Sequence, residues 1–209
     1  MNLTDLSLNL RLQRVPVKKV FRYRHLVSNT RHLTPAPRGS SMTEAGAALQ
    51  EEFSYSSSMY HVGYLVTDIA ATMADLGASL GLTWTEVVVR DAQRMWTPEH
   101  GATTVPLTFA YSQQGPQYVE LLQGSSGSIW DAAGSPGLHH AGVWADVPAL
   151  TNSLLAKGWT LECSQLAPDE GYGSFTYVRS PTGFLLEPVD YRSRARIERW
   201  FAGEPLQSA

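Results

Sequence analysis

The first clear pattern of apolar and polar positions begins at residue 60. Residues 60–66 form a short, mostly apolar run that predicts a strand. Apolar residues then recur at spacings of four, three and four, which predicts a helix over 69–80 with one buried face. That face consists of Ile69, Met73, Leu76 and Leu80. Asp68 is expected to cap the helix by accepting from its free N–H groups, and Gly81 is expected to end it.

The same pattern occurs a second time, 79 positions further along the chain. Residues 60–68 read YHVGYLVTD, and residues 137–146 read GLHHAGVWAD. Each stretch contains a histidine, one apolar residue, a glycine, an apolar run and an aspartate. A second helix is expected over 147–157, after Asp146. An internal repeat of this kind indicates two structural units of similar build.

Three further strands are expected after each helix. The predicted strands are 83–90, 104–111 and 117–122 in the first copy, and 160–165, 174–179 and 183–189 in the second. We also expect a loop at 91–101, a short helix at 125–133 and a terminal helix at 192–201. Each copy is therefore predicted to have the order β-α-β-β-β, which places the chain in the α+β class.

These elements predict a division of the chain into four parts. Residues 1–58 are expected to form a basic, flexible N-terminal extension and linker. The first βαβββ module is expected at 59–125, the second at 137–190, and a C-terminal helix and tail at 191–209.

Charge separates the N-terminal segment from the remainder of the chain. Residues 1–41 contain eight Lys or Arg and one acid, whereas the remainder contains eight Lys or Arg and eighteen acids. The net charges are therefore +7 and −10. Three interpretations remain open: an organelle transit peptide, an upstream extension with Met42 as the true start, and a basic tail for an acidic partner. Without organelle targeting, a cytoplasmic location is expected.

Composition excludes several classes of protein. Hydrophobic residues make up 43% of the 209-residue chain and charged residues 17%, which is typical of a globular protein. The single cysteine, Cys163, excludes an internal disulfide framework and a cysteine-rich zinc site. No apolar run reaches the roughly 18 to 20 residues of a membrane span, so no membrane partner is expected. The acidic body gives no reason to expect nucleic-acid binding.

Four motifs in this order resemble the vicinal oxygen chelate superfamily. They are HVGYLVTD, YVELLQG, GLHHAGVWADV and GFLLEP. The superfamily includes glyoxalase I, methylmalonyl-CoA epimerase, extradiol dioxygenases and bleomycin-resistance proteins, and the motifs look most like its glyoxalase and epimerase branch. The resemblance covers about residues 59–190. It implies that the two modules form an open, barrel-like mixed sheet with one metal site on the concave face.

The resemblance implies four metal ligands, one on the first strand and one on the fourth strand of each module. Carried over by position, they are His61, Glu120, His140 and Glu187. The ion would be one divalent metal, namely Zn, Ni, Co, Mn or Fe.

The residue types support this assignment on their own. Both glutamates lie in otherwise apolar strands, and a buried carboxylate is costly unless it is paired or binds a metal. Because side chains alternate along a strand, each histidine shares a face with the glycine two residues later, which leaves space for a metal or substrate. His139 should point the opposite way to His140. Tyr111, Trp144, Tyr172 or Tyr177 could line a pocket.

The resemblance implies a metal-dependent lyase or isomerase. Its substrate would be a small carbonyl or thioester compound that loses an α-proton to give an enolate. In glyoxalase I a ligand glutamate takes the proton, and Glu187 matches that position, with Glu120 as its possible partner. The arginine and asparagine that hold glutathione there match Leu65 and Gly124 here. The second base of the epimerases matches Pro106.

Two other functions remain open. An extradiol-type dioxygenase would hold Fe(II) through His61, His140 and Glu187. A bleomycin-resistance type of binding protein would hold a small molecule without catalysis. Family members often dimerise, so a homodimer is also expected by analogy.

A chain that begins at Met42 is expected to keep its metal content and to melt within a few degrees of the full chain. The reason is the charge difference at residue 41 and the Pro/Gly/Ser-rich junction at 35–41, which indicate that the basic segment does not belong to the core. Metal analysis and thermal unfolding of both chains test this. A large fall in the melting temperature on truncation would show that the segment packs against the modules.

Overall fold

The order of helices and strands follows the predicted repeat. The computed structural model describes residues 58–207, so the expected extension at 1–57 lies outside the described residues. The first unit consists of β1 (Met59–Leu65), α2 (Ile69–Leu80), β2 (Val88–Thr97), β3 (Gly101–Tyr111) and β4 (Tyr118–Gly124). The second unit consists of β5 (Gly137–Ala145), α3 (Val147–Leu155), β6 (Thr160–Ser164), the 3₁₀ turn η2 (Pro168–Glu170), β7 (Thr176–Arg179) and β8 (Leu185–Asp190). The 3₁₀ turn η3 (Tyr191–Ser193) then leads into α4 (Arg194–Phe201).

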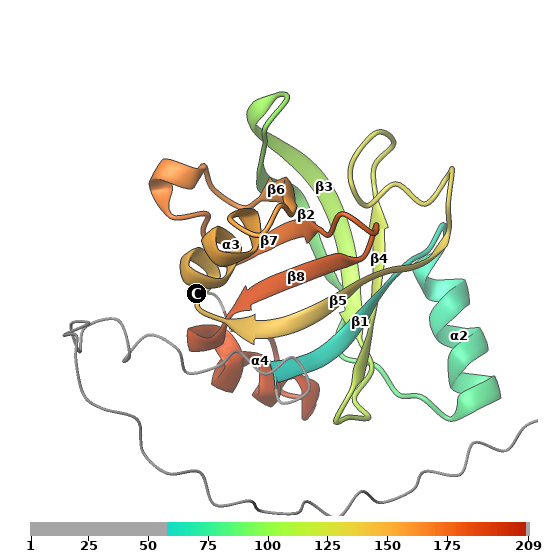
Figure 1. The fold of residues 1–209 in the computed structure, drawn as a ribbon. Helices are drawn as coiled ribbons and strands as arrows, with labels where there is room; N and C mark the ends of the chain where they lie inside the picture. The colour runs from blue at the N-terminus through green and yellow to red at the C-terminus, as the bar shows by residue number, and fades with distance from the viewer. Residues whose placement is uncertain (1–57, 208–209) are drawn as a thin grey trace, which may run out of the picture. The chain divides into compact units, whose positions relative to one another are not determined.

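All eight strands belong to one closed barrel, in the order β1-β4-β3-β2-β6-β7-β8-β5 (Figure 1). In each unit the first strand pairs in parallel with the fourth. The units meet along β1 and β5, which pair antiparallel, and along β2 and β6, which share the single register pair Trp96 and Ser164. The α+β fold of two βαβββ modules is therefore confirmed. The sheet was expected to form an open barrel, but the pairing of Trp96 with Ser164 closes it.

The helices α2 and α3 cover the outside of the barrel (Figure 1). The predicted caps are present: Asp68 Oδ1 accepts from the N–H of Ala71 at 2.9 Å, and Asp146 Oδ1 accepts from the N–H of Ala149 at 3.0 Å. Gly81 ends α2 in the left-handed conformation, with φ of 72°. These caps fix where each helix leaves the end of its preceding strand.

The helix α4 lies beside the end of β8 and the start of β1 (Figure 1). Its Trp200 and Phe201 are buried, and their rings lie 5.5 and 4.9 Å from the ring of Tyr111, measured between centroids. Because Tyr111 belongs to the main core of the barrel, α4 is part of the wall around the barrel interior.

The elements predicted between residues 83 and 101 were partly wrong. The predicted loop at 91–101 is mostly strand, since β2 continues to Thr97 and pairs with β3. The buried positions of β2 include the polar Gln93 as well as Met95. The apolar alternation that would indicate a strand is therefore weak. The predicted strand at 83–90 correspondingly begins only at Val88.

The short helix expected at 125–133 is absent, and the segment forms turns. Asp131 accepts from the N–H groups of Gly127 and Ala133, and the hydroxyl of Ser128 donates to the carbonyl of Ser125. Such local side-chain bonds compete with helical hydrogen bonds, which explains the difference.

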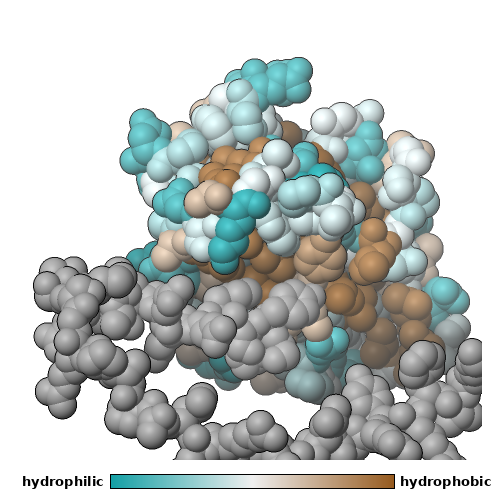
Figure 2. Space-filling view, in the orientation of Figure 1, coloured by the Kyte–Doolittle hydropathy of each residue, from teal (hydrophilic) through white to brown (hydrophobic). Residues whose placement is uncertain are grey.

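Hydrophobic residues gather on the barrel face over β5 and β1 (Figure 2). Tyr64 and Leu138, which are register partners there, are 43% and 73% exposed. The homodimer expected by analogy stays a prediction. Among residues 58–207, no helix is long and apolar enough to cross a membrane.

Candidate metal centre

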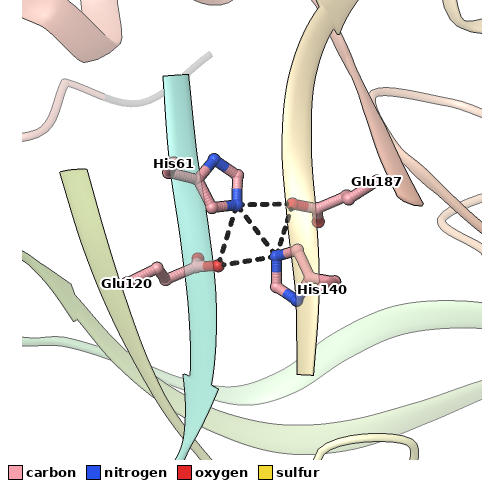
Figure 3. A group of neighbouring side chains, drawn as sticks. All are labelled: His61, Glu120, His140 and Glu187. Atoms are coloured by element: carbon pink, nitrogen blue, oxygen red, sulfur yellow. Dashed lines mark hydrogen bonds and ion pairs between the residues drawn. The ribbon is translucent and has the colours of Figure 1, made fainter. Parts of the chain in front are cut away.

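The four candidate ligands lie on four neighbouring strands, β4, β1, β5 and β8. Their side chains point toward one another inside the barrel (Figure 3). One donor atom from each of His61, Glu120, His140 and Glu187 lies within 4.8 Å of the donor atoms of the other three. The structure therefore brings together all four residues that the sequence singled out.

Strand register explains why these four positions meet. Across β4, β1 and β5 the register partners are Glu120, Gly63 and His140, and across β1, β5 and β8 they are His61, Gly142 and Glu187. Each row therefore has a glycine between a glutamate and a histidine. The two rows are two residues apart along β1 and β5, so all four functional side chains share one face.

The two glycines have a different role from the one expected. We expected each to leave space for a metal or substrate, but each accommodates the histidine of the other module. A Cβ on Gly63 would overlap the ring of His140, and a Cβ on Gly142 would overlap the ring of His61. The close approach of the two imidazoles therefore depends on both glycines.

The spacing of the donor atoms fits one ion. The two Nε2 atoms of His61 and His140 lie 2.8 Å apart. Oε2 of Glu120 lies 3.3 Å from each of these nitrogens, and Oε2 of Glu187 lies 3.0 and 3.1 Å from them. Ligand atoms that are about 2.0–2.1 Å from a common ion lie roughly 2.8–3.4 Å from one another, depending on the coordination geometry.

Burial supports the same conclusion. All four residues are buried, and His61 has no exposed surface. Among the described residues, no group other than the imidazole nitrogens of His61 and His140 is placed to pair with Oε2 of either glutamate. Buried carboxylates are costly, and coordination of a divalent cation would offset that cost.

The charges of the four groups are strongly coupled. Burial lowers the pKa of His140, but the carboxylates of Glu187 and Glu120 raise it to about 9. Burial raises the pKa of Glu187, but the charge of His140 and hydrogen bonds from both histidines hold it well below its usual range. Without metal the carboxylates therefore favour protonation of the imidazoles. Because metal needs neutral imidazoles, binding releases protons and weakens as the pH falls.

His139 contacts the centre from outside the ligand set. Strand alternation predicted that it points away from His140, yet its Nδ1 lies 3.0 Å from Nδ1 of His140. Burial and the charge of His140 lower the pKa of His139 to about 4, so it is neutral at pH 7. Its lone pair can accept from Nδ1–H of His140, which leaves the lone pair of His140 Nε2 free for a metal.

A cavity of about 120 Å³ adjoins the carboxylates Glu120 and Glu187. Of the aromatic residues that we considered as pocket-lining, Tyr111 and Tyr177 line it. Trp144 stacks on Tyr60 and lines a second pocket, and the hydroxyl of Tyr172 donates to Asn152. The lining of the first cavity also includes Arg90, Arg196 and Trp200, which sequence reasoning did not single out.

Substituting alanine for Gly63 or Gly142 should destabilise the protein by about 1–3 kcal/mol and reduce its metal content, because the new Cβ displaces a ligand ring. Gly134→Ala is the matched control, since a Cβ at Gly134 meets no atom within 4 Å. Thermal unfolding and metal analysis measure both effects. Unchanged metal content in both variants would show that the rings do not need this space.

His139→Phe should lower metal affinity about 10- to 100-fold, because it removes the acceptor that orients His140 while keeping an aromatic ring. Competition with a chromophoric chelator measures the affinity. His100→Phe, at an exposed position away from the centre, is the control. Equal affinities of the two variants would contradict an orienting role for His139.

No protein of curated function matches the chain. Among solved structures, a Streptomyces coelicolor methylmalonyl-CoA epimerase in complex with 2-nitronate-propionyl-CoA is 21% identical, with a TM-score of 0.43 over 64% of this chain and 96% of that chain. The Mycobacterium tuberculosis methylmalonyl-CoA epimerase is 16% identical, with a TM-score of 0.44 over 64% and 87% of the two chains.

A 4-hydroxymandelate synthase variant from Streptomyces coelicolor is 12% identical, with a TM-score of 0.45 over 63% of this chain and 48% of that chain. At these identities and TM-scores, the three structures do not indicate which reaction this chain catalyses. The pattern of the Glyoxalase/Bleomycin resistance protein/Dioxygenase superfamily matches residues 60–177, which is more than half of the chain and includes His61, Glu120 and His140. The chain therefore belongs to the Glyoxalase/Bleomycin resistance protein/Dioxygenase superfamily.

Proposed function

We propose that the protein is a metal-dependent lyase or isomerase that moves an α-proton of a small carbonyl or thioester substrate. The observation that carries this proposal is the convergence of His61, Glu120, His140 and Glu187 beside a cavity. A divalent ion held by these residues would supply Lewis-acid polarisation of the substrate oxygen and so acidify the adjacent carbon.

Glu187 is the proposed base. It is buried, lines the cavity and would have to take a proton from a carbon held there. While it is paired with the histidines, its low pKa makes it a weak base. A Glu187 carboxylate that turns toward the cavity would lose those interactions, whereas burial, which raises its pKa, would remain. Movement away from the centre would therefore increase its basicity.

Glu120 is the proposed partner of Glu187. It approaches the centre from β4, and Glu187 approaches it from β8, with β1 and β5 between them (Figure 3). Both carboxylates line the cavity, so one could return a proton that the other has removed. Such an arrangement suits an isomerase as well as a lyase.

Three tyrosines line the same cavity as these carboxylates. Burial, followed by the charges of the two glutamates, raises the pKa of Tyr60 and Tyr177 well above the usual range. Burial and the charge of Glu120 do the same for Tyr111. The three hydroxyls therefore keep their protons and can donate hydrogen bonds to an oxygen in the cavity.

The positions that differ from the known enzymes of the family limit the choice of reaction. Leu65, at the position of the glutathione-binding arginine, is part of the hydrophobic core. Pro106, at the position of the second epimerase base, is exposed on β3 and cannot accept a proton from carbon. We therefore do not assign glutathione as a substrate, and the two glutamates are the bases that we propose.

The alternatives are less well supported by the geometry. A dioxygenase site built from two histidines and Glu187 would not use Glu120 as a ligand. However, Oε2 of Glu120 lies 3.3 Å from Nε2 of both histidines. A passive binding protein would have little reason to bury two carboxylates beside its ligand.

Glu187→Gln should slow exchange of the α-protons of 2-oxopentanoate with deuterated solvent by about 100-fold or more, because an amide cannot act as the base. The metal-loaded full-length protein is compared with the variant by proton NMR. Glu162→Gln is the control, because Glu162 pairs with Arg179 outside the cavity.

Exchange by Glu187→Gln at the wild-type rate would place the base elsewhere. Absence of exchange with any carbonyl compound, together with bound iron and oxygen consumption with a catechol, would favour the dioxygenase.

A further inference from the structure

Two arginines that line the cavity have no acidic partner among residues 58–207. They are Arg90 on β2 and Arg196 on α4, and they share the cavity with Glu120 and Glu187. The other five arginines in this range each lie within 3.8 Å of a carboxylate oxygen. They are Arg94, Arg179, Arg192, Arg194 and Arg199. The unpaired guanidinium groups are therefore confined to the cavity.

Arg90 is held in place by uncharged groups. Its guanidinium lies 5.3 Å from the ring centroid of Phe109, and one of its N–H groups donates to the buried side chain of Gln93. Arg196 donates to the backbone carbonyl of Gln207 at 2.8 Å. Because each guanidinium has five N–H donors, most of the donors on both side chains remain available to a ligand.

The two arginines also affect each other electrostatically. Burial and the positive charge of Arg196 lower the pKa of Arg90. Like charges held near each other are unfavourable, and an anion between them would offset that repulsion.

Trp200 adds a third donor from the same helix as Arg196. It lines the same cavity and is 2% exposed, and its indole N–H has no acceptor among the described residues. A buried donor without an acceptor is costly, and such groups in native structures usually have a partner. A ligand oxygen in the cavity would supply that partner.

We infer that Arg90, Arg196 and Trp200 form a subsite for an anionic oxygen group, a carboxylate or a phosphate, on the substrate. This inference rests on the proposed function, since the carbonyl end of the same molecule would lie at the histidine and glutamate centre. The cavity of about 120 Å³ is somewhat smaller than the roughly 150 Å³ cavity that holds benzene in an engineered protein. A substrate with only a few atoms between its two polar ends fits this volume.

Three probes of equal chain length test the subsite on the metal-loaded full-length protein. They are 2-oxopentanoate, 2-oxoglutarate and 2-oxo-4-phosphonobutanoate. All three carry the same 2-oxo acid group, and they differ only in a methyl, carboxylate or phosphonate end. Calorimetric binding constants therefore isolate the contribution of the anionic end, and the two charged probes distinguish a carboxylate site from a phosphate site.

One or both charged probes should bind at least about tenfold more tightly than 2-oxopentanoate, as expected for charge-assisted hydrogen bonds. The double variant Arg90→Gln/Arg196→Gln should remove this preference. Trp200→Phe should reduce it severalfold. Arg199→Gln, on the same helix but paired with Glu204, should bind like the wild type.

A preference for the charged probes that persists in the double variant, or equal binding of all three to the wild type, would overturn the inference. If none of the three binds, the proposed function has failed, and titration with inorganic sulfate decides the subsite separately. Sulfate that quenches tryptophan fluorescence in the wild type and not in the double variant supports an anion site. Sulfate that has no effect on the wild type rejects it.

Discussion

The cost of burying two carboxylates is the constraint on which the structure of the barrel interior depends. Glu120 and Glu187 lie in strands whose other residues are mostly apolar, and the imidazole nitrogens of His61 and His140 are the groups among the described residues that pair with their inner oxygens. Positive charge stabilises such buried carboxylates, and the histidines provide it when no cation is present. The register of four strands, the two glycines and the contact from His139 all serve to bring the imidazoles to the carboxylates.

The repeat explains how a short chain builds this centre. Each module supplies one histidine and one glutamate, and each also supplies the glycine that admits the histidine of the other module. Neither module can complete the site alone. The antiparallel pairing of β1 with β5 is therefore both the main joint between the modules and the framework of the site.

Much of the fold could be predicted from the sequence, because it depends on local patterns, and the four central residues were carried over by position from the family resemblance. The repeated His-x-Gly strands, the aspartate caps and the amphipathic helix α2 are short-range signals. The extent of β2 could not be predicted, because its stability comes from pairing with β3 and one of its buried residues is Gln93. Arg90 and Arg196 were missed for a related reason: they are 106 positions apart and meet at one cavity only through the tertiary fold.

The position of α4 has a consequence for how the protein can evolve. The helix follows the last strand of the repeat and lies beyond the residues that match the superfamily, yet its Arg196, Ile197 and Trp200 form part of the cavity wall. Part of the wall that contacts a ligand is thus encoded after Glu187, the last residue of the reactive centre. Replacement of a few codons in the α4 segment can alter which molecules are accepted while the reactive centre is inherited intact.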